Sequence, residues 1–143
     1  MFELTYRSVA SSSISEKDIL EILNEAKTFN FQNNITGCLV FYDNHFIQIL
    51  EGDENIIKQI FSKIVIDSRH SNVQVLSEGI KKERFFPDWN MAYSDMNETL
   101  EINVEVKNYA NNLLLLSEFI DKPTTTLKMF WAGINRLIAN PAI

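Results

Sequence analysis

Apolar residues recur along this chain with two different periods, which predict strands and helices in turn. A period of two residues indicates a strand, because alternate side chains of a strand share a face, and a period near 3.6 residues indicates a helix. On this basis we expect strands at 2–8, 35–42, 45–51 and 72–76, helices at 15–30 and 53–68, and a candidate fifth strand at 89–93.

Local signals support several of these boundaries. Ser15 followed by Asp18 has the spacing of a capping box, in which the two side chains bond free N–H groups in the first turn of a helix. Asp43 and Asn44 stand between two apolar runs and favour a tight turn. The second and third strands are therefore expected to form a hairpin.

The resulting order is βαββαβ followed by one further strand. This order is typical of an α+β, ferredoxin-like fold, with a mixed sheet and two helices packed on one sheet face. The first and third strands are then neighbours at the centre of the sheet. The opposite sheet face is left to be covered by something else.

From about residue 97 the pattern predicts two amphipathic helices, interrupted at Lys122 and Pro123. Their apolar stripes contain Val106, Tyr109, Ala110, Leu113 and Leu114 before the proline, and Leu127, Phe130, Trp131, Ile134, Leu137 and Ile138 after it. Helices this apolar on one side need a partner surface in water. We expect a domain at 1–95 and a helical extension at 96–143, which covers the open sheet face or mediates contacts with another subunit or partner.

One polar residue interrupts an apolar face of the third predicted strand. Gln48 lies between Phe46 and Leu50 on one side, whereas Ile47 and Ile49 occupy the other. Burying an amide without a hydrogen-bond partner costs about 1–3 kcal/mol. Gln48 therefore lies either at an exposed edge or beside a partner inside the fold.

Tyr6 is the natural partner, because the first and third strands are neighbours in this fold. A buried phenol beside a buried amide forms a hydrogen-bonded pair that can take a third member. Asn30, at the end of the first helix, adds a second amide, and Trp89 and Met91 alternate on the fifth strand. A flat heterocycle between the two helices fits these groups, although several ligands share that chemistry.

Composition narrows the classes of function. The chain has 143 residues, 45% of them hydrophobic, so we expect one domain. Its formal net charge is -6, so it lacks the basic surface expected of a protein that binds nucleic acid or an anionic membrane. Its single cysteine, Cys38, favours a reducing compartment. No leader pattern and no apolar run of about 20 residues is present, so we expect a cytoplasmic protein that is neither secreted nor anchored.

Common catalytic and metal motifs are missing. The sequence has four glycines and no Gly-rich phosphate loop, and no Cys/His cluster that would bind a metal. His45 and His70 are the two histidines, and neither has a nucleophile nearby in sequence. We expect neither a metal site nor catalytic residues.

Five short motifs occur in order along residues 1–95. They are Tyr6-x-Ser8, Asn30 ahead of Ile35-Thr36-Gly37, Phe46-x-Gln48-x-Leu50-Glu51-Gly52, Asp67-x-Arg69-His70, and Arg84-x-Phe86-x-x-Trp89-x-Met91. Each motif is weak alone, but the set closely resembles the BLUF domain, a blue-light sensor module that uses a bound flavin. The C-terminal helices resemble the tail of the short, stand-alone BLUF proteins.

The resemblance implies roles for individual residues. Asn30 and Gln48 would hydrogen-bond the flavin ring, and Tyr6 would bond Gln48 and donate an electron and a proton to the excited flavin. Rotation or tautomerisation of the Gln48 amide would then shift the absorption to the red. Asp67, with Arg69 or His70, would lie near the ribityl chain, and Trp89 and Met91 would relay the rearrangement outward.

Two positions depart from the commonest pattern of the family. Phe29 precedes Asn30 where many members have a polar residue, so one ring contact is lost or made by water. Lys63 stands where an arginine is often seen, and its point charge would reach a phosphate less specifically than a planar guanidinium. We expect flavin as the cofactor, with FAD favoured over FMN.

The resemblance therefore implies a non-enzymatic photoreceptor that signals through the C-terminal helices to a partner protein, and that forms a homo-oligomer. The alternative from another class is a small acylphosphatase-like hydrolase on the same scaffold. That enzyme would need a phosphate-cradling loop after the first strand, where residues 9–14 supply serines but no glycine.

Overall fold

The structure is a computed structural model that describes residues 1–86, 92–95 and 123–139. Its strands are β1 (Phe2–Ala10), β2 (Thr36–Tyr42), β3 (His45–Gly52), β4 (His70–Ile80) and β5 (Ala92–Asp95), and its helices are α1 (Glu16–Gln32), α2 (Glu54–Val65) and α4 (Thr125–Ala139). The predicted order βαββαβ is therefore confirmed, and a short strand, β5, follows it in the described residues.

The five strands form one sheet in the order β4-β1-β3-β2-β5. β1 pairs antiparallel with both β3 and β4, β2 pairs antiparallel with β3, and β5 adds in parallel beside β2. This is the expected α+β, ferredoxin-like arrangement, with β1 and β3 adjacent at its centre. In the β1–β3 register Tyr6 lies directly opposite Gln48.

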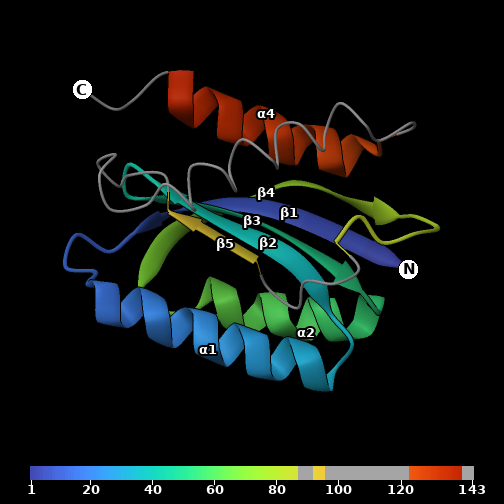
Figure 1. Ribbon diagram of the computed structural model, residues 1–143, viewed down its shortest axis with the longest axis horizontal. Coiled ribbons are helices and arrows are strands. Elements are labelled where there is room, and N and C mark those ends of the chain that lie inside the picture. The colour runs from blue at the N-terminus through green and yellow to red at the C-terminus, as the bar shows by residue number, and fades with distance from the viewer. Residues whose placement is uncertain (87–91, 96–122, 140–143) are drawn as a thin grey trace.

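Helices cover both faces of this sheet (Figure 1). α1 and α2 lie together on one face, where they pack on Leu4, Leu39, Phe46 and Leu50. α4 lies on the other face, where Leu127, Phe130 and Ile134 pack on Ile47 and Ile49. The two sets of strand residues alternate along β3, as the period-two pattern requires.

The local signals act as the sequence indicates. Ser15 is the N-cap of α1 and forms the reciprocal capping box with Asp18, and Asp53 is the N-cap of α2. Asp43 and Asn44 both have positive φ, 48° and 61°, which suits the two-residue turn of the β2–β3 hairpin.

Several boundaries differ from the prediction by one or two residues, and the differences are larger in β4 and α2. β4 runs from His70 to Ile80 rather than 72–76, because it is an edge strand whose mostly exposed residues lack a clear alternating pattern. α2 ends at Val65, since Asp67 to His70 form a turn closed by the Asp67 carbonyl. β5 is described at Ala92–Asp95, and the predicted strand positions 89–91 lie outside the described residues.

The C-terminal region is described in part. α4 contains the predicted stripe that follows Pro123, and the stripe predicted at 106–114 lies outside the described residues. The domain boundary at 95/96 stays a prediction. No helix among residues 1–86, 92–95 and 123–139 combines the length and apolar composition that a membrane crossing needs.

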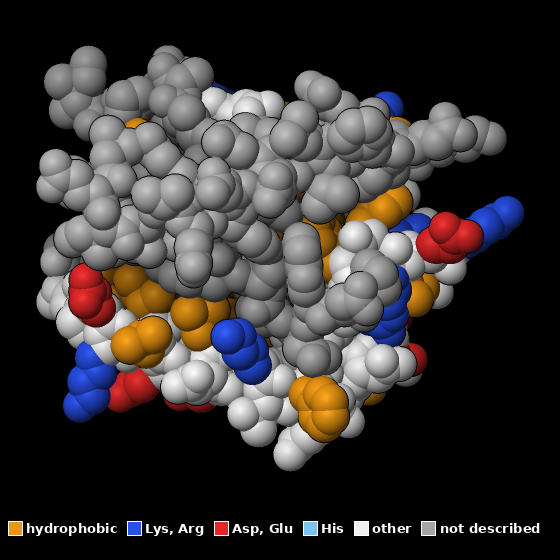
Figure 2. All heavy atoms as spheres, in the orientation of Figure 1, with side chains coloured by type: hydrophobic (Ala, Val, Ile, Leu, Met, Phe, Trp, Pro, Cys, Tyr) orange, Lys and Arg blue, Asp and Glu red, His pale blue; other side chains and the backbone are white. Residues whose placement is uncertain are grey.

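The face of the molecule that carries α1 mixes charges of both signs. Figure 2 shows Lys or Arg and Asp or Glu side chains in the part of the view where Figure 1 places α1. Neither sign forms a continuous patch among the described side chains of that face, and apolar side chains lie between them.

Gly37 allows a close approach of two central strands. A Cβ added there would lie 2.0 Å from the carbonyl oxygen of Ile49, whereas a Cβ at Gly79 on edge strand β4 would meet no atom within 4 Å. The backbone of β3 cannot move away cheaply, since β1 pairs with it on the other side.

We therefore expect Gly37→Ala to lower the free energy of unfolding by about 1–3 kcal/mol or more, because overpacking in a close-packed sheet forces the backbone apart. Gly79→Ala is the matched control and should change it by less than about 0.5 kcal/mol. Urea unfolding of the two variants measures the difference. Equal effects would contradict the steric explanation.

Candidate functional site

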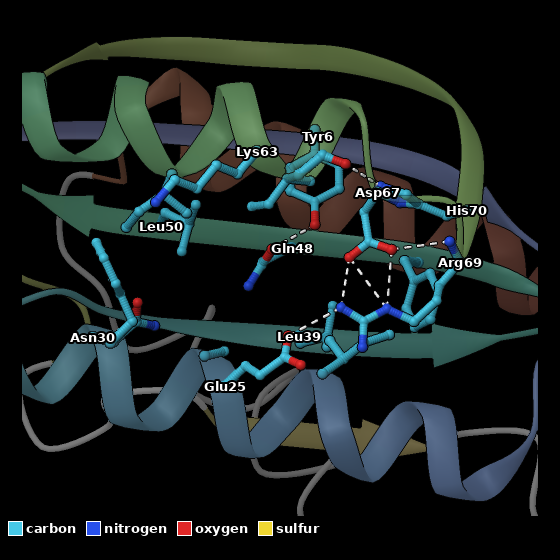
Figure 3. Close-up of a pocket in the computed structure, with 16 residues that line it drawn as sticks. Tyr6, Glu25, Asn30, Leu39, Gln48, Leu50, Lys63, Asp67, Arg69 and His70 are labelled. Atoms are coloured by element: carbon cyan, nitrogen blue, oxygen red, sulfur yellow. Dashed lines mark hydrogen bonds and ion pairs between the residues drawn. The ribbon is translucent and has the colours of Figure 1, made fainter.

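A cavity lies between α1, α2 and the sheet face that these helices cover (Figure 3). Its volume is about 210 Å³. The lining consists of Tyr6, Ile22, Glu25, Ala26, Phe29, Asn30, Leu39, Phe46, Gln48, Leu50, Ile60, Lys63, Ile64, Asp67, Arg69 and His70. Most of its surface is apolar, with a few polar groups from several elements.

Tyr6 and Gln48 meet on the sheet side of the cavity. The Tyr6 hydroxyl donates a hydrogen bond of 2.5 Å to Gln48 Oε1, and the nitrogen end of the amide points away from the phenol (Figure 3). Both residues are about 95% buried, with 4% and 5% of their surface exposed. Burial raises the pKa of the Tyr6 phenol above its ordinary value, and the negative charge of Asp67 raises it further.

Asn30 enters the cavity from the last turn of α1 and is 2% exposed. Its backbone carbonyl accepts hydrogen bonds from the N–H groups of Asn33 (3.3 Å) and Ile35 (2.9 Å). The chain therefore turns from α1 into β2 around this residue. The turn fixes the position from which the Asn30 side chain reaches the cavity.

A cluster of charges closes one end of the cavity. The Arg69 guanidinium donates hydrogen bonds to both Asp67 carboxylate oxygens, at 2.6 Å to 3.2 Å, and to Glu25 Oε2 at 3.0 Å. The pair with Glu25 joins α1 to the turn between α2 and β4. The Arg69 side-chain hydrogen bonds hold the pKa of Asp67 below its ordinary value, although partial burial opposes the shift.

His70 lies behind the Tyr6 ring at the start of β4. Its Nδ1 lies 2.8 Å from Ser8 Oγ, and its Nε2 bonds the Ile64 carbonyl oxygen, so that Nε2 carries a proton. The imidazole also makes edge contacts with the rings of Tyr6 and Phe46. His70 thus ties β1, α2 and β4 together beside the phenol.

Lys63 supplies a second cation at the cavity. Its ammonium lies 5.7 Å from the centre of the Phe29 ring, within cation–π range. Within the described part of the chain, no carboxylate lies within salt-bridge distance of it. Lys63 differs in this respect from Arg69, which has two carboxylate partners.

The lining fits a flat, mostly apolar ring with polar edges. Apolar side chains of α1 and α2, such as Ile22, Phe29 and Ile60, stand on either side of the gap, and amides from Asn30 and Gln48 reach it from different elements. Charged groups gather at one end, where a polar tail would reach solvent. This combination of apolar walls and few polar groups is typical of cofactor sites.

Seven residues predicted from the sequence line this one cavity. They are Tyr6, Asn30, Gln48, Lys63, Asp67, Arg69 and His70. Trp89 and Met91, the other two predicted site residues, lie outside the described residues. Within the described part, no group of three or more His, Cys, Asp or Glu side chains is placed to hold a metal ion.

Sequence reasoning missed Glu25, which lines the cavity and bonds Arg69. Its position contained a signal: Glu25 lies three residues after Ile22 and four before Phe29, so it is on the helix face that carries the apolar stripe. A carboxylate at that spacing indicates a cationic partner on a neighbouring element.

Comparison with known proteins identifies the family. The family model described as "BLUF: Sensors of blue-light using FAD" matches residues 1–92. The chain belongs to the BLUF family. It is a sensor of blue light with a flavin cofactor, FAD by the family's own description.

Several BLUF relatives are larger than this chain. The blue light- and temperature-regulated antirepressor BluF of Escherichia coli (strain K12) is 39% identical over 83 residues, which are 57% of this chain and 21% of that protein. Photoactivated adenylate cyclase subunit beta of Euglena gracilis is 29% identical over 136 residues, 92% of this chain and 16% of that protein. The chain thus spans a small part of these relatives' length and corresponds to their BLUF portion.

Solved BLUF structures of similar length share the fold. BlsA in its photo-activated state is 30% identical, with a TM-score of 0.67 over 90% of both chains. The dark-state structure of BlrB is 27% identical, with a TM-score of 0.68 over 96% of this chain and 94% of that one. These matches give no support to the acylphosphatase-like alternative.

The Asp67–Arg69 pair makes the stability of the fold depend on pH. Because the pKa of Asp67 is lowered in the folded protein, its ionised form stabilises the fold above the ordinary pKa of about 3.9, and this contribution is lost as the pH falls through the lowered value. We expect Asp67→Asn to be less stable than wild type at pH 7, with the difference shrinking below about pH 4. Denaturant unfolding of both proteins between pH 3 and 7 measures this; a constant difference would contradict it.

Proposed function

We propose that this BLUF domain is a non-enzymatic light switch, in which Tyr6 and Gln48 are the photoactive pair. The observation that carries the proposal is the 2.5 Å hydrogen bond from the Tyr6 hydroxyl to Gln48 Oε1 on the wall of the cavity. A phenol and an amide buried together have no solvent to exchange with. Their hydrogen bonds therefore change only as a unit.

The cavity residues fall into two groups, which would contact different parts of the cofactor. Asn30 and Gln48 would bond the edge of the flavin ring, and the apolar side chains of α1 and α2 would pack on its faces. Asp67, Arg69 and His70 would contact the ribityl chain at the charged end, and Lys63, which lies over Phe29, would contact the phosphate. Bound flavin absorbs blue light and in its excited state is a strong one-electron oxidant.

Tyr6 is the electron and proton donor in this proposal. Loss of an electron makes a phenol far more acidic, so the raised pKa of the resting Tyr6 does not hold its proton once the electron has left. The electron would be held by the flavin, and the proton would move along the short bond to Gln48 Oε1. Both particles return to Tyr6 at the end of the cycle, so no covalent bond lasts.

Gln48 stores the result as a new hydrogen-bond pattern. Its amide has a donor end and an acceptor end, and rotation or tautomerisation changes which group faces Tyr6 and which faces the cofactor. A donor directed at a ring carbonyl stabilises the more polar excited state and shifts absorption to the red. Exchanging one or two buried hydrogen bonds changes the free energy by about 1–3 kcal/mol, enough to bias a two-state element by about 5–150-fold.

The output passes to another protein or domain. The matched relatives carry the names of an antirepressor and of adenylate cyclase subunits, in which the shared BLUF portion is a small part of the chain. In the present chain α4 packs on the sheet face opposite the cavity, where a changed β3 can reach it. We propose that α4 and the residues before it contact a signalling partner, in a homo-oligomer, and that Trp89 and Met91 contribute to the relay.

The proposed role of Tyr6 is tested by removing one hydroxyl. Tyr6→Phe should keep flavin bound, because the cavity keeps its shape, but should abolish the red shift that blue light produces, because no proton can follow the electron. The measurement is the visible spectrum of the holoprotein before and after blue light. Tyr42→Phe is the matched control, since Tyr42 packs on the α4 side of the sheet, and it should keep the shift.

A normal photocycle in Tyr6→Phe would overturn the role of Tyr6. Gln48→Leu addresses the switch itself and should also lose the light-induced shift, because leucine can neither donate nor accept. A wild-type chain that purified without flavin would overturn the whole proposal.

The proposed role of Lys63 is tested by removing its charge. Lys63→Met should weaken FAD or FMN binding about fivefold, as expected for a partly exposed ion pair of about 1 kcal/mol, and should leave riboflavin binding unchanged because riboflavin has no phosphate. Lys58→Met on the same helix is the control, because Lys58 pairs with Glu54. Titration of the apoprotein by fluorescence measures the affinities. An equal loss for riboflavin would contradict phosphate contact.

A further inference from the structure

A second buried polar residue lies on β3, three positions after Gln48. Glu51 has no exposed surface, and its side chain faces the α4 side of the sheet, opposite the cavity that Gln48 lines. A buried carboxylate is costly unless hydrogen bonds and opposite charge compensate for its lost hydration. The light-switch mechanism above makes no use of this group.

Glu51 accepts four hydrogen bonds from two other parts of the chain. Its Oε1 accepts from Thr36 Oγ1 and from the Phe86 N–H, both at 2.7 Å. Its Oε2 accepts from the Phe85 N–H at 2.9 Å and from Lys81 Nζ at 2.5 Å. The carboxylate therefore bonds β3 to β2 and to the segment that follows β4.

Two cations complete the attachment of that segment. Lys81 also pairs with Glu3 on β1 at 2.8 Å, so it lies between two buried carboxylates. Arg84 donates to Thr36 Oγ1 at 2.8 Å and to the backbone carbonyl oxygens of Asn34 and Glu51. Residues 81–86 are thus held on the sheet chiefly through side chains, with Glu51 at the centre.

Phe86 connects this attachment to α4. Its N–H bonds Glu51, while its ring packs against Phe130 of α4 with centroids 6.3 Å apart in an edge-to-face arrangement. Phe130 in turn contacts Trp131 at 5.4 Å. Phe86 and Phe130 are almost fully buried. A continuous path of described contacts therefore runs from β3 to α4.

We propose that Glu51 is a positioning residue that couples the strand carrying Gln48 to α4 through Phe86 and Phe130. The inference rests on the proposed function, because it takes the rearrangement at Gln48 as its input. A carboxylate held by four donors moves with the strand that carries it. A shift or twist of β3 at Gln48 therefore moves the Phe86 backbone, and the Phe86 ring moves against Phe130.

A movement of β3 could also reach α4 by a second, direct route. α4 also packs on β3 itself, where the side chain of Ile47 lies close to Gly133. Direct packing would transmit a movement of β3 without Glu51. The two routes differ in what they require: only the first depends on a group that accepts hydrogen bonds at both of its ends.

Glu51→Gln separates the two routes with a minimal change of shape. The amide nitrogen donates and does not accept, so whichever way it turns it faces two donors that the carboxylate oxygen had bonded. Glu54→Gln is the matched control, because it removes the same charge three residues later from a side chain whose partner is the exposed Lys58. The readout is amide hydrogen exchange of residues 125–136 in the holoprotein, in darkness and under blue light, beside the flavin spectrum.

In wild type and Glu54→Gln we expect light to change exchange in α4. Glu51→Gln should keep bound flavin and the red shift. The difference in α4 amide exchange between light and darkness should fall about threefold or more, because buried hydrogen bonds on the path are lost. Phe86→Leu keeps the backbone bond to Glu51 but removes the aromatic contact, and should show the same loss. Phe86→Leu also tests the proposed coupling if Glu51→Gln does not fold.

The inference is overturned, in favour of direct packing through Ile47, if the α4 response is unchanged in Glu51→Gln. If Glu51→Gln does not fold, an unchanged α4 response in Phe86→Leu overturns it. Loss of the red shift in folded Glu51→Gln overturns it too, because Glu51 would then act on the photoactive pair. A wild type with a normal red shift but no α4 response overturns the inference alone. A wild type with no red shift overturns the proposed function, and the coupling with it.

Discussion

The hydrogen bond between Tyr6 and Gln48 is the constraint on which the rest of this structure depends. Neither the phenol nor the amide can be buried alone without a cost of about 1–3 kcal/mol, so the two must meet inside the fold. Their meeting requires that β1 and β3 be adjacent, that their register bring residues 6 and 48 face to face, and that α1 and α2 exclude water from above. The sheet order and the helix layer satisfy all three conditions.

β3 carries buried polar side chains on both of its faces, and this makes it the link between the two layers of the protein. Gln48 faces the cavity under α1 and α2, whereas Glu51, an odd number of positions later, faces α4. Each is stabilised by partners from other elements, so neither can change its bonds without those partners. A light sensor needs such a connection, because its cofactor site lies under α1 and α2 on one sheet face and its output must reach another surface.

Much of the fold follows from local patterns. The capping box at Ser15, the turn at Asp43 and Asn44 and the alternating strands depend on residues that are neighbours in sequence, so the order of elements could be predicted and was confirmed. The Tyr6–Gln48 pairing was within reach because the ferredoxin-like order makes the first and third strands neighbours. The extent of β4 could not be predicted, because an edge strand pairs on one side only and much of its surface stays in water. Its sequence therefore shows a weaker alternation of apolar and polar residues.

Within the elements that it predicts, the sequence by itself indicates which residues share a face, because that depends on the period of the local backbone. It also carried the motifs that identify the family. Only the tertiary structure decided which faces meet: Arg69 bonds Glu25 across 44 residues of chain, and Glu51 collects donors from residues 36, 81, 85 and 86. Such contacts depend on how helices and loops pack on the sheet, and no short-range pattern records that.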